Sequence, residues 1–183
     1  MINHNTCEVF FDNLEVPAEN LIGDEGQGFK YIVDSMNAER ILIASESLGD
    51  AQLLHPPRRD YAKERVVFGR PDRPEPGRGV PDRARARADM IAAELVVQKA
   101  ARCSRRERDC GAEANMGKML AADAAWAAAE ACLQTFGGFG YAREYGIERK
   151  WRETRLYQTA PISTNMMLAS HRPARAGPRR GSY

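Results

Sequence analysis

The sequence has no long apolar run, and none approaches the roughly 20 residues that a helix needs to cross a bilayer. Its first residues also lack the basic and apolar regions of a signal peptide. These two absences argue against a membrane-spanning protein and against a secreted one. A soluble intracellular protein is therefore expected.

Cysteine and histidine are scarce, with 4 and 3 residues in a chain of 183. Cys7, Cys103, Cys110 and Cys132 show no C-x-x-C spacing and no histidine pairing typical of a zinc site. Reduced thiols are the default for such a pattern. We therefore expect no metal site.

The charges nearly balance, because 27 lysines and arginines face 25 aspartates and glutamates, for a formal net charge of +2. So small a basic excess does not indicate a protein that binds nucleic acid. The length fits one domain and is ample for a single hydrophobic core.

Three glycines within four positions interrupt the chain after a long alanine-rich segment: Gly137, Gly138 and Gly140. Such a run cannot continue a helix, and it lets the backbone turn sharply and another group approach closely. Taken alone, it is typical of a helix end with a tight turn, and a bound phosphate is the alternative. With Gln134 and Tyr141, the glycines form Q-x-x-G-G-x-G-Y. This pattern resembles a signature near the end of the C-terminal helical domain of the acyl-CoA dehydrogenase family.

Members of that family carry an N-terminal helical domain, a middle β domain and a C-terminal four-helix bundle. This chain is long enough only for the last of these. The resemblance implies an all-α fold, a C-terminal four-helix bundle preceded by one leftover β-strand at residues 6–13, which are rich in β formers. Residues 1–25 would end the middle domain and form a linker, residues 26–183 would form the bundle, and residues 71–87 would be irregular.

Apolar residues at helical spacing predict the helices of this bundle. They fall at residues 29–53, 88–102, 115–136 and 145–155. Trp151 is expected to be the buried anchor of the last one. Residues 161–164 are typical of a further helix start with hydroxyl caps.

The resemblance implies an FAD-dependent oxidoreductase of fatty acid metabolism. It would introduce an α,β double bond into an acyl-CoA thioester and pass electrons to an electron-transfer flavoprotein, as a homodimer or homotetramer. Its location would be the cytoplasm in a bacterium or the mitochondrial matrix in a eukaryote. The chain alone is expected to be inactive because the middle domain holds much of the flavin and thioester. Two alternatives are an inactive truncated helical assembly module and an acyl-CoA oxidase.

An adjacent carboxylate and guanidinium lie in the segment Asn37-Ala38-Glu39-Arg40, on a predicted helix that is otherwise half apolar. By themselves they are typical of an exposed helical ion pair. Dehydrogenation, however, needs a carboxylate base that faces the substrate Cα–Cβ bond in a dry pocket.

Most members of the family supply that base from a Y-E-G-T segment near the C-terminus, where this sequence has Pro161. Isovaleryl-CoA and long-chain acyl-CoA dehydrogenases use a glutamate from an earlier helix, in an E-R pair similar to Glu39-Arg40. The resemblance therefore implies Glu39 as the catalytic base. Asn37, Ala38 and Arg40 would contact the substrate.

Residues 61–70 resemble the family pattern Y-x-x-x-R-x-x-F-G. In that pattern the arginine reaches the FAD pyrophosphate and the phenylalanine packs by the adenosine, usually across a subunit boundary. A guanidinium fork suits a diphosphate. The resemblance implies FAD contacts at Arg65, Phe68, Gln134, Gly137, Gly138, Ser163 and Asn165.

Residues 55–59 and 71–87 are rich in proline and arginine and match nothing in the family. Pro74, Pro76 and Pro81 are expected to prevent the continuous helix that the family has there. The composition is typical of an exposed or poorly ordered basic loop.

A second interpretation of these departures is a reading-frame error in the gene sequence. With suitable codons, residues 72–76, 103–107 and 171–177 read one nucleotide later give segments that resemble the family. The DNA around codons 54 to 110, read in three frames, would test this interpretation.

Overall fold

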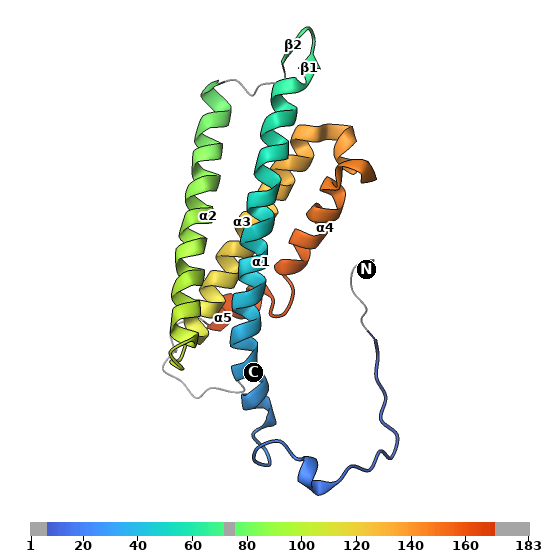
Figure 1. The fold of residues 1–183 in the computed structure, drawn as a ribbon, viewed down its shortest axis with the longest axis vertical. Helices are drawn as coiled ribbons and strands as arrows, with labels where there is room; N and C mark the ends of the chain where they lie inside the picture. Colours follow the sequence, from blue (N-terminus) through green and yellow to red (C-terminus); the bar gives the residue numbers. More distant parts are fainter. Residues whose placement is uncertain (1–6, 72–75, 171–183) are drawn as a thin grey trace.

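The computed structural model describes residues 7–71 and 76–170. Within them the chain is mostly helical, which confirms the all-α prediction (Figure 1). The longer helices are α1 (Gly28–Glu64), α2 (Pro76–Ser104), α3 (Gly111–Phe136), α4 (Ile147–Tyr157) and α5 (Thr164–Ser170). The short elements are η1 (Ala18–Asn20), β1 (Val66–Val67), β2 (Arg70–Pro71), η2 (Gly137–Tyr141) and η3 (Arg143–Tyr145).

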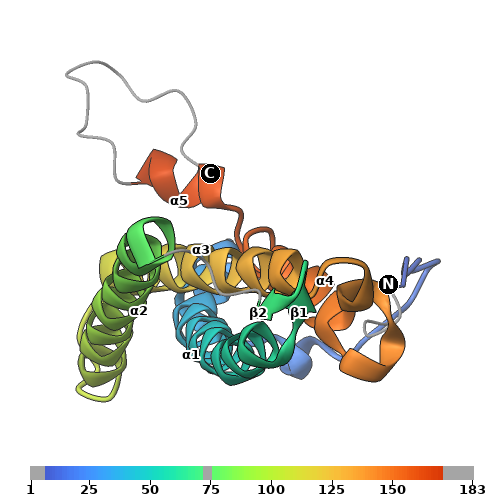
Figure 2. The same ribbon diagram turned by 90° about the horizontal axis from the view of Figure 1, so that it is seen from above.

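The bundle is built around α3, which packs against α1, α2 and α4 (Figures 1 and 2). Small residues line its inner face, where Ala121, Ala122, Ala125 and Ala129 have no exposed surface. At Gly117 an added Cβ would lie 3.2 Å from Val97 Cγ2 of α2. Short side chains therefore let the helices approach closely, as the alanine-rich sequence predicts.

Helix α1 is longer than the predicted 29–53, since it continues to Glu64. Its 37 residues span about 55 Å at 1.5 Å per residue. Pro56 and Pro57 lie inside it. Each lacks the N–H that would bond to the preceding turn. Burial of Leu54 against α3 and α4 and the packing of Tyr61 stabilise the helix on both sides of the two prolines.

The expectation that residues 71–87 are irregular is wrong from residue 76 onward, because α2 begins at Pro76. Proline is tolerated at the first helical position, where its missing N–H needs no partner. Alternating alanine and arginine between positions 84 and 88 favour helix. Residues 72–75 lie outside the described residues.

The leftover β-strand is not formed in the described part of its segment, residues 7–13. A strand needs partners for its backbone groups, and the nearest ones belong to the β1–β2 hairpin at the far end of α1. Phe10, Phe11 and Ile22 are 82%, 76% and 88% exposed. The segment instead runs away from the bundle (Figure 1).

The residues that helix α4 buries do not include Trp151, which the sequence predicted as its buried anchor. Ile147, Thr154 and Tyr157 are buried, whereas Trp151 is half-buried and packs at the edge of the core. Its indole Nε1 donates to Glu130 Oε1 at 2.6 Å. The hydrogen bond keeps the polar edge of the ring at the surface, so the prediction of a buried anchor at Trp151 is wrong.

Among residues 7–71 and 76–170, no helix is both long and apolar enough to span a membrane.

Candidate cofactor and substrate site

The residues singled out from the sequence fall into two clusters near opposite ends of the bundle. We call Arg65, Phe68, Gln134, Gly137 and Gly138 the Arg65 cluster. We call Asn37, Ala38, Glu39, Arg40, Ser163 and Asn165 the Arg40 cluster. Arg65 follows Arg40 by 25 positions, almost wholly along α1, so these two residues lie about 38 Å apart.

The Arg65 cluster forms where α1 ends beside the end of α3. Arg65 Nη1 donates to the backbone oxygens of Thr135 at 3.1 Å and Phe136 at 3.4 Å. Carbonyls at a helix C-terminus lack helical partners and carry partial negative charge, so a guanidinium is a fitting donor there. These contacts bring Arg65 against the glycine turn, which begins 72 residues further along the chain.

Gly137 ends α3 with a φ of 59°, a conformation that favours glycine. A Cβ at this position would lie 3.3 Å from Arg65 Nη1. A side chain would therefore crowd the guanidinium. The next residue, Gly138, is exposed, as is Gln134 on the last turn of α3.

Three aromatic rings pack next to the Arg65 cluster, and the sequence analysis gave none of them a role of its own. Tyr61 stacks on Phe136 with centroids 4.1 Å apart, and Tyr145 meets Phe136 edge-on at 5.4 Å. The Arg65 guanidinium lies 5.8 Å from the centre of the Tyr61 ring. Tyr61 precedes Arg65 by one helical turn, the i, i+4 spacing contained in the Y-x-x-x-R part of the sequence pattern.

Phe68 stands apart from the rings, at the tip of the β1–β2 hairpin. Phe68 and Gly69 have φ values of 52° and 78°, as a two-residue hairpin turn requires. The Phe68 side chain is 100% exposed. It touches no core and is free to pack against another molecule.

In the Arg40 cluster, Arg40 is buried and Glu39 is exposed. Arg40 Nη2 donates to Asn37 Oδ1, and its buried Nε has no partner in the described part of the chain. Burial lowers the pKa of Arg40, and the nearby Cys110 and Glu39 partly oppose that effect. The Glu39 carboxylate forms no ion pair with any described residue, so the pair is not the surface ion pair that its sequence alone suggests. Ala38 is exposed beside it.

Lys118 is a fully buried cation of α3 that sequence analysis missed. Its Nζ donates to the backbone oxygen of Ile162 at 2.8 Å. Burial lowers its pKa to about 8, an effect that Asp123 opposes and Arg40 reinforces. The available signal was its spacing, since Lys118 occupies the same helical face as Ala114, Ala121 and Ala125.

The Lys118 bond holds the turn that carries Ser163 and Asn165. Ser163 Oγ accepts a hydrogen bond from the Met166 N–H at 3.4 Å, which confirms the predicted hydroxyl cap of α5. Asn165 is exposed, and Met167 anchors the helix in the core. Both candidate cofactor residues on this turn are therefore fixed relative to Lys118 and Arg40.

Replacing Lys118 with methionine is expected to remove a pH dependence of stability. The pKa of Lys118 is about 8 in the folded chain and 10.5 without burial. Between these values the unfolded chain holds a proton that the folded chain has lost, so stability rises with pH, by at most about 1.4 kcal/mol per unit. Urea unfolding from pH 7.5 to 10.5 should show the unchanged protein gaining stability relative to Lys118→Met.

The difference between the unchanged protein and Lys118→Met reports on Lys118, because the other groups with shifted pKa values are present in both proteins. Burial raises the pKa of the Cys110 and Cys132 thiols, so their contribution falls with pH above 9 in each case. Lys30→Met, at an exposed lysine of α1, is the control and should give a flat difference. Parallel curves for the native protein and Lys118→Met would contradict the assignment.

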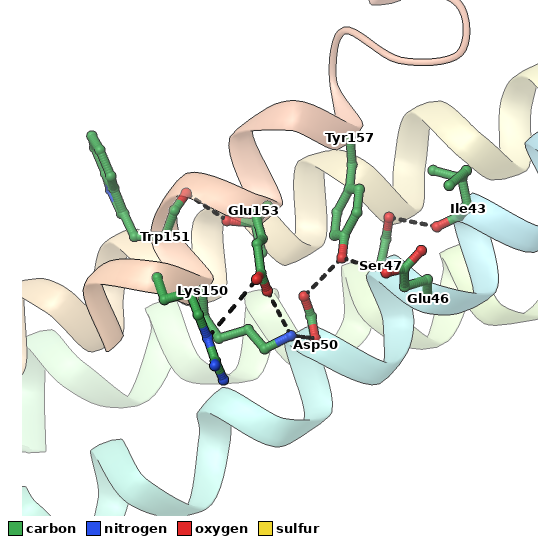
Figure 3. A network of polar contacts seen from close by, with 10 residues as sticks. Ile43, Glu46, Ser47, Asp50, Lys150, Trp151, Glu153 and Tyr157 are labelled. Carbon is green, nitrogen blue, oxygen red and sulfur yellow. Dashed lines mark hydrogen bonds and ion pairs between the residues drawn. The ribbon is translucent and has the colours of Figure 1, made fainter. Parts of the chain in front are cut away.

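A buried polar network joins α1 to α4 midway between the two clusters (Figure 3). Lys150 Nζ lies 2.7 Å from Asp50 Oδ1 and 2.8 Å from Glu153 Oε2. Tyr157 donates to Asp50 Oδ2 at 3.0 Å or to Glu46 Oε1 at 3.1 Å. Burial and the two carboxylates raise the pKa of Tyr157, so its hydroxyl remains a donor. The network fixes the orientation of α4 and of the segment that leads to Ser163.

Comparison with known proteins decides the family. Residues 26–169 match the family described as acyl-CoA dehydrogenase, C-terminal domain. The chain belongs to the acyl-CoA dehydrogenase family. It is 43% identical over 158 residues to an acyl-CoA dehydrogenase of Bacillus subtilis (strain 168), which covers 84% of this chain and 40% of that protein.

Two further relatives support membership of this family. The mitochondrial short/branched chain specific acyl-CoA dehydrogenase of Bos taurus is 34% identical over 165 residues, or 90% of this chain and 38% of that one. The structure of butyryl-CoA dehydrogenase from Megasphaera elsdenii matches with a TM-score of 0.79 at 31% identity, covering 87% of this chain and 41% of that one. The chain thus spans about two fifths of the length of these relatives.

The Arg65 cluster fits one end of the FAD that the family implies. A half-buried guanidinium lies beside a glycine turn that has no Cβ to block an approaching phosphate. An exposed aromatic ring, Phe68, offers a face for an adenine base. A metal site has no comparable support, since the described residues contain no group of three or more His, Cys, Asp or Glu placed to hold one.

Proposed function

We propose that this chain is the C-terminal helical part of an FAD-dependent enzyme that removes hydrogen from the α and β carbons of an acyl-CoA thioester. The observation that carries the proposal is the pair of clusters on α1. One presents a guanidinium and glycine backbone suited to a diphosphate, and the other presents an exposed carboxylate beside a buried arginine. Family membership supplies the chemistry that links them.

In this proposal Glu39 takes the α-proton of the substrate. The chemistry that bound FAD would supply is that of a hydride acceptor for the β carbon. Arg40 supports the Glu39 carboxylate electrostatically, and Asn37 holds Arg40 in place through the bond to its Nη2. Asn37, Ala38 and Arg40 together line the substrate side. Pro161 occupies the late position at which most of the family has its base, and this supports Glu39 as the base.

As a general base, Glu39 needs a cover, and no residue in the described part of the chain buries its side chain. A general base works best in a dry pocket, where its pKa and reach are controlled. The exposed carboxylate of Glu39 would gain that environment from a preceding domain. The chain alone is therefore expected to be an inactive helical module, which is also the alternative function for the polypeptide as it stands.

The separation of the clusters favours an assembly in which two copies share each cofactor. Arg65, Phe68, Gln134, Gly137 and Gly138 of one copy would hold the diphosphate and adenosine. Ser163 and Asn165 of the other copy would contact the same FAD nearer its flavin. The Arg65 cluster lies at the end of α1, about 38 Å along the helix from Arg40, and this separation supports a cofactor shared between copies. A homodimer, or a homotetramer made of two such dimers, satisfies this geometry.

Mixed dimers test the sharing in a full-length form of the protein that includes the N-terminal and middle domains. One subunit carries Arg65→Glu and the other carries Ser163→Ala with Asn165→Ala. If each site draws on both copies, the mixed dimer has one undamaged site of its two, so flavin absorbance should recover to about half of the native ratio. Each variant alone should lose FAD, because charge reversal removes a charge-assisted bond worth about tenfold or more in affinity.

Arg143→Glu is the matched control, since Arg143 is an exposed arginine after the same glycine turn. It should keep the native flavin ratio. If mixed dimers bound no more FAD than either variant alone, each site would lie within one chain and the shared-site proposal would fail.

The remaining proposals rest on the family. Electrons would leave to an electron-transfer flavoprotein. An oxygen-electrode assay distinguishes this electron transfer from the reaction of an acyl-CoA oxidase, which would consume oxygen. The location would be the cytoplasm in a bacterium or the mitochondrial matrix in a eukaryote.

A further inference from the structure

A cleft lies between α1 and α2, and α3 forms its floor. Figure 2 shows α3 lying against both of these helices. The volume of the cleft is about 430 Å³, within the range of about 300 to 1,000 Å³ that small-molecule sites occupy. Of the residues that line it, only Gln134 belongs to the Arg65 cluster, and none belongs to the Arg40 cluster.

Small side chains on α3 leave this space open. Four alanines on one face of the helix form the floor: Ala124, Ala127, Ala128 and Ala131. Their methyl groups project too little to reach across to α1 and α2. Leu54 of α1, 2% exposed, and Met90 of α2 add longer apolar side chains to the walls. The cleft therefore offers an apolar surface that gains free energy when it is covered.

The polar part of the lining is cationic or neutral. Arg58 and His55 come from α1, and Arg87 comes from α2. Among the described residues that line the cleft, none is an aspartate or a glutamate. A concave surface lined by charges of one sign attracts a ligand of the opposite sign. The charge of the cleft therefore favours an anion.

Arg58 is held in place by bonds to the floor. Its Nε donates to Thr135 Oγ1 at 3.2 Å, and Thr135 Oγ1 donates to the Ala131 oxygen at 2.7 Å. The side chain is half-buried. Burial raises the pKa of the Cys132 thiol to about 11, and Arg58 partly opposes that effect, so its charge acts into the interior. An anion in the cleft would feel the same weakly screened charge.

The length of the cleft limits the size of its ligand. Arg58 follows Ala51 by seven positions on α1, a rise of about 10 Å. An extended carbon chain advances about 1.2 Å per bond, so about ten carbons match this length. A carboxylate at one end of such a chain would reach the guanidinium groups of Arg58 and Arg87, whose planar forks suit its two oxygens.

We propose that this cleft binds an alkyl carboxylate of about ten carbons. The carboxylate lies between Arg58 and Arg87, and the alkyl chain covers the four alanines of α3. The apolar floor selects the chain, and the cationic walls select the charge. This site is independent of the proposed dehydrogenation, because Glu39 and Arg40 take no part in it.

Isothermal titration of the full chain with sodium decanoate, below the concentration at which it forms micelles, tests the cleft. Decanoate should bind saturably, and octanoate should bind about tenfold more weakly, because each buried methylene adds about fourfold to affinity. Ala127→Leu fills the floor from an exposed position and should weaken decanoate binding at least tenfold. Arg87→Gln should weaken it about tenfold, the loss of one charge-assisted hydrogen bond.

Each variant has a matched control outside the cleft. Ala92→Leu enlarges an exposed alanine of α2 that does not line the cleft, and Arg85→Gln removes a charge from an exposed arginine of the same helix. Both should change decanoate affinity less than twofold. Equal weakening by Ala92→Leu and Ala127→Leu, or by Arg85→Gln and Arg87→Gln, would show non-specific binding and overturn the proposal. Equal affinities for octanoate and decanoate would overturn the burial of the chain.

Two other occupants give distinct results. Displacement of decanoate by adenosine diphosphate would make the cleft an extension of the proposed cofactor site beside Gln134. Self-association of the chain that Ala127→Leu abolishes, measured by analytical ultracentrifugation, would mean that a second copy fills the cleft. Either result would overturn the proposal. Decanoate binding that depends on Ala127 and Arg87 and resists adenosine diphosphate supports it, even if the proposed dehydrogenation proves wrong.

Discussion

Replacing Glu39 with glutamine in a full-length, flavin-loaded form of the protein is expected to lower kcat by at least about 100-fold, and by as much as about 10,000-fold. Glutamine keeps the size and polarity of the side chain and cannot accept the α-proton. Stopped-flow reduction of the flavin by acyl-CoA measures the step directly. Acyl-CoA should still bind, because the substitution leaves Arg40 and its bond to Asn37 in place.

Glu64→Gln is the control for this result. Glu64 is also an exposed glutamate of α1, at the opposite end of the helix from Glu39, and its substitution should leave turnover nearly unchanged. The assignment of the base would be wrong if Glu39→Gln retained full turnover. A loss of acyl-CoA binding in place of a loss of rate would point to a substrate-binding role for Glu39.

The sequence was most informative where local patterns and packing agree. The alanine-rich stretch predicted α3, and the observed helix differs only by starting at Gly111 in place of residue 115. The glycine run predicted its end, and Gly137 does end it with a positive φ. In both cases the determining interactions lie within a few residues of each other, so a single sequence contains them.

Local rules failed where burial elsewhere decides the conformation. Prolines at positions 56, 57, 76 and 81 argue for an irregular chain, yet α1 and α2 continue through or begin at them. Burial of Leu54 and the packing of Tyr61 outweigh the hydrogen bonds lost near Pro56 and Pro57. Such contacts come from residues more than 70 positions away, so no window of sequence shows them.

The candidate site also combines features that the sequence predicted with features that only the structure shows. Motifs identified Arg65 and Gly137 separately, and the structure brings them together at the end of α3. The burial of Lys118 and its bond to the Ile162 oxygen were not predicted, because a lone lysine on an alanine-rich face gives no hint of its partner. The distance between the Arg40 and Arg65 clusters also required the structure, since it depends on α1 continuing unbroken to Glu64.

Replacing Asp50 with alanine is expected to destabilise the chain by about 3 kcal/mol. Asp50 is the shared acceptor of the α1–α4 network, with its side chain 8% exposed (Figure 3). Its loss would leave the Lys150 ammonium without one of its two carboxylates and the Tyr157 hydroxyl with Glu46 as its remaining acceptor. Removal of one partner of a buried ion pair costs about 3 to 5 kcal/mol. The low end of this range applies because the Lys150 side chain is 21% exposed and keeps its ion pair with Glu153. Urea unfolding at pH 7 gives the value.

Asp60→Ala on the same helix is the matched control. Asp60 also accepts from a cation, Arg59 Nε at 2.9 Å, but its side chain is 50% exposed and water replaces the lost partner. Its effect should be far smaller than that of Asp50→Ala. The double variant Asp50→Ala with Lys150→Met should recover part of the loss, because it also removes the uncompensated charge. Equal effects of Asp50→Ala and Asp60→Ala would mean that the network contributes no more than a surface ion pair, and that α4 is held on α1 by apolar packing alone.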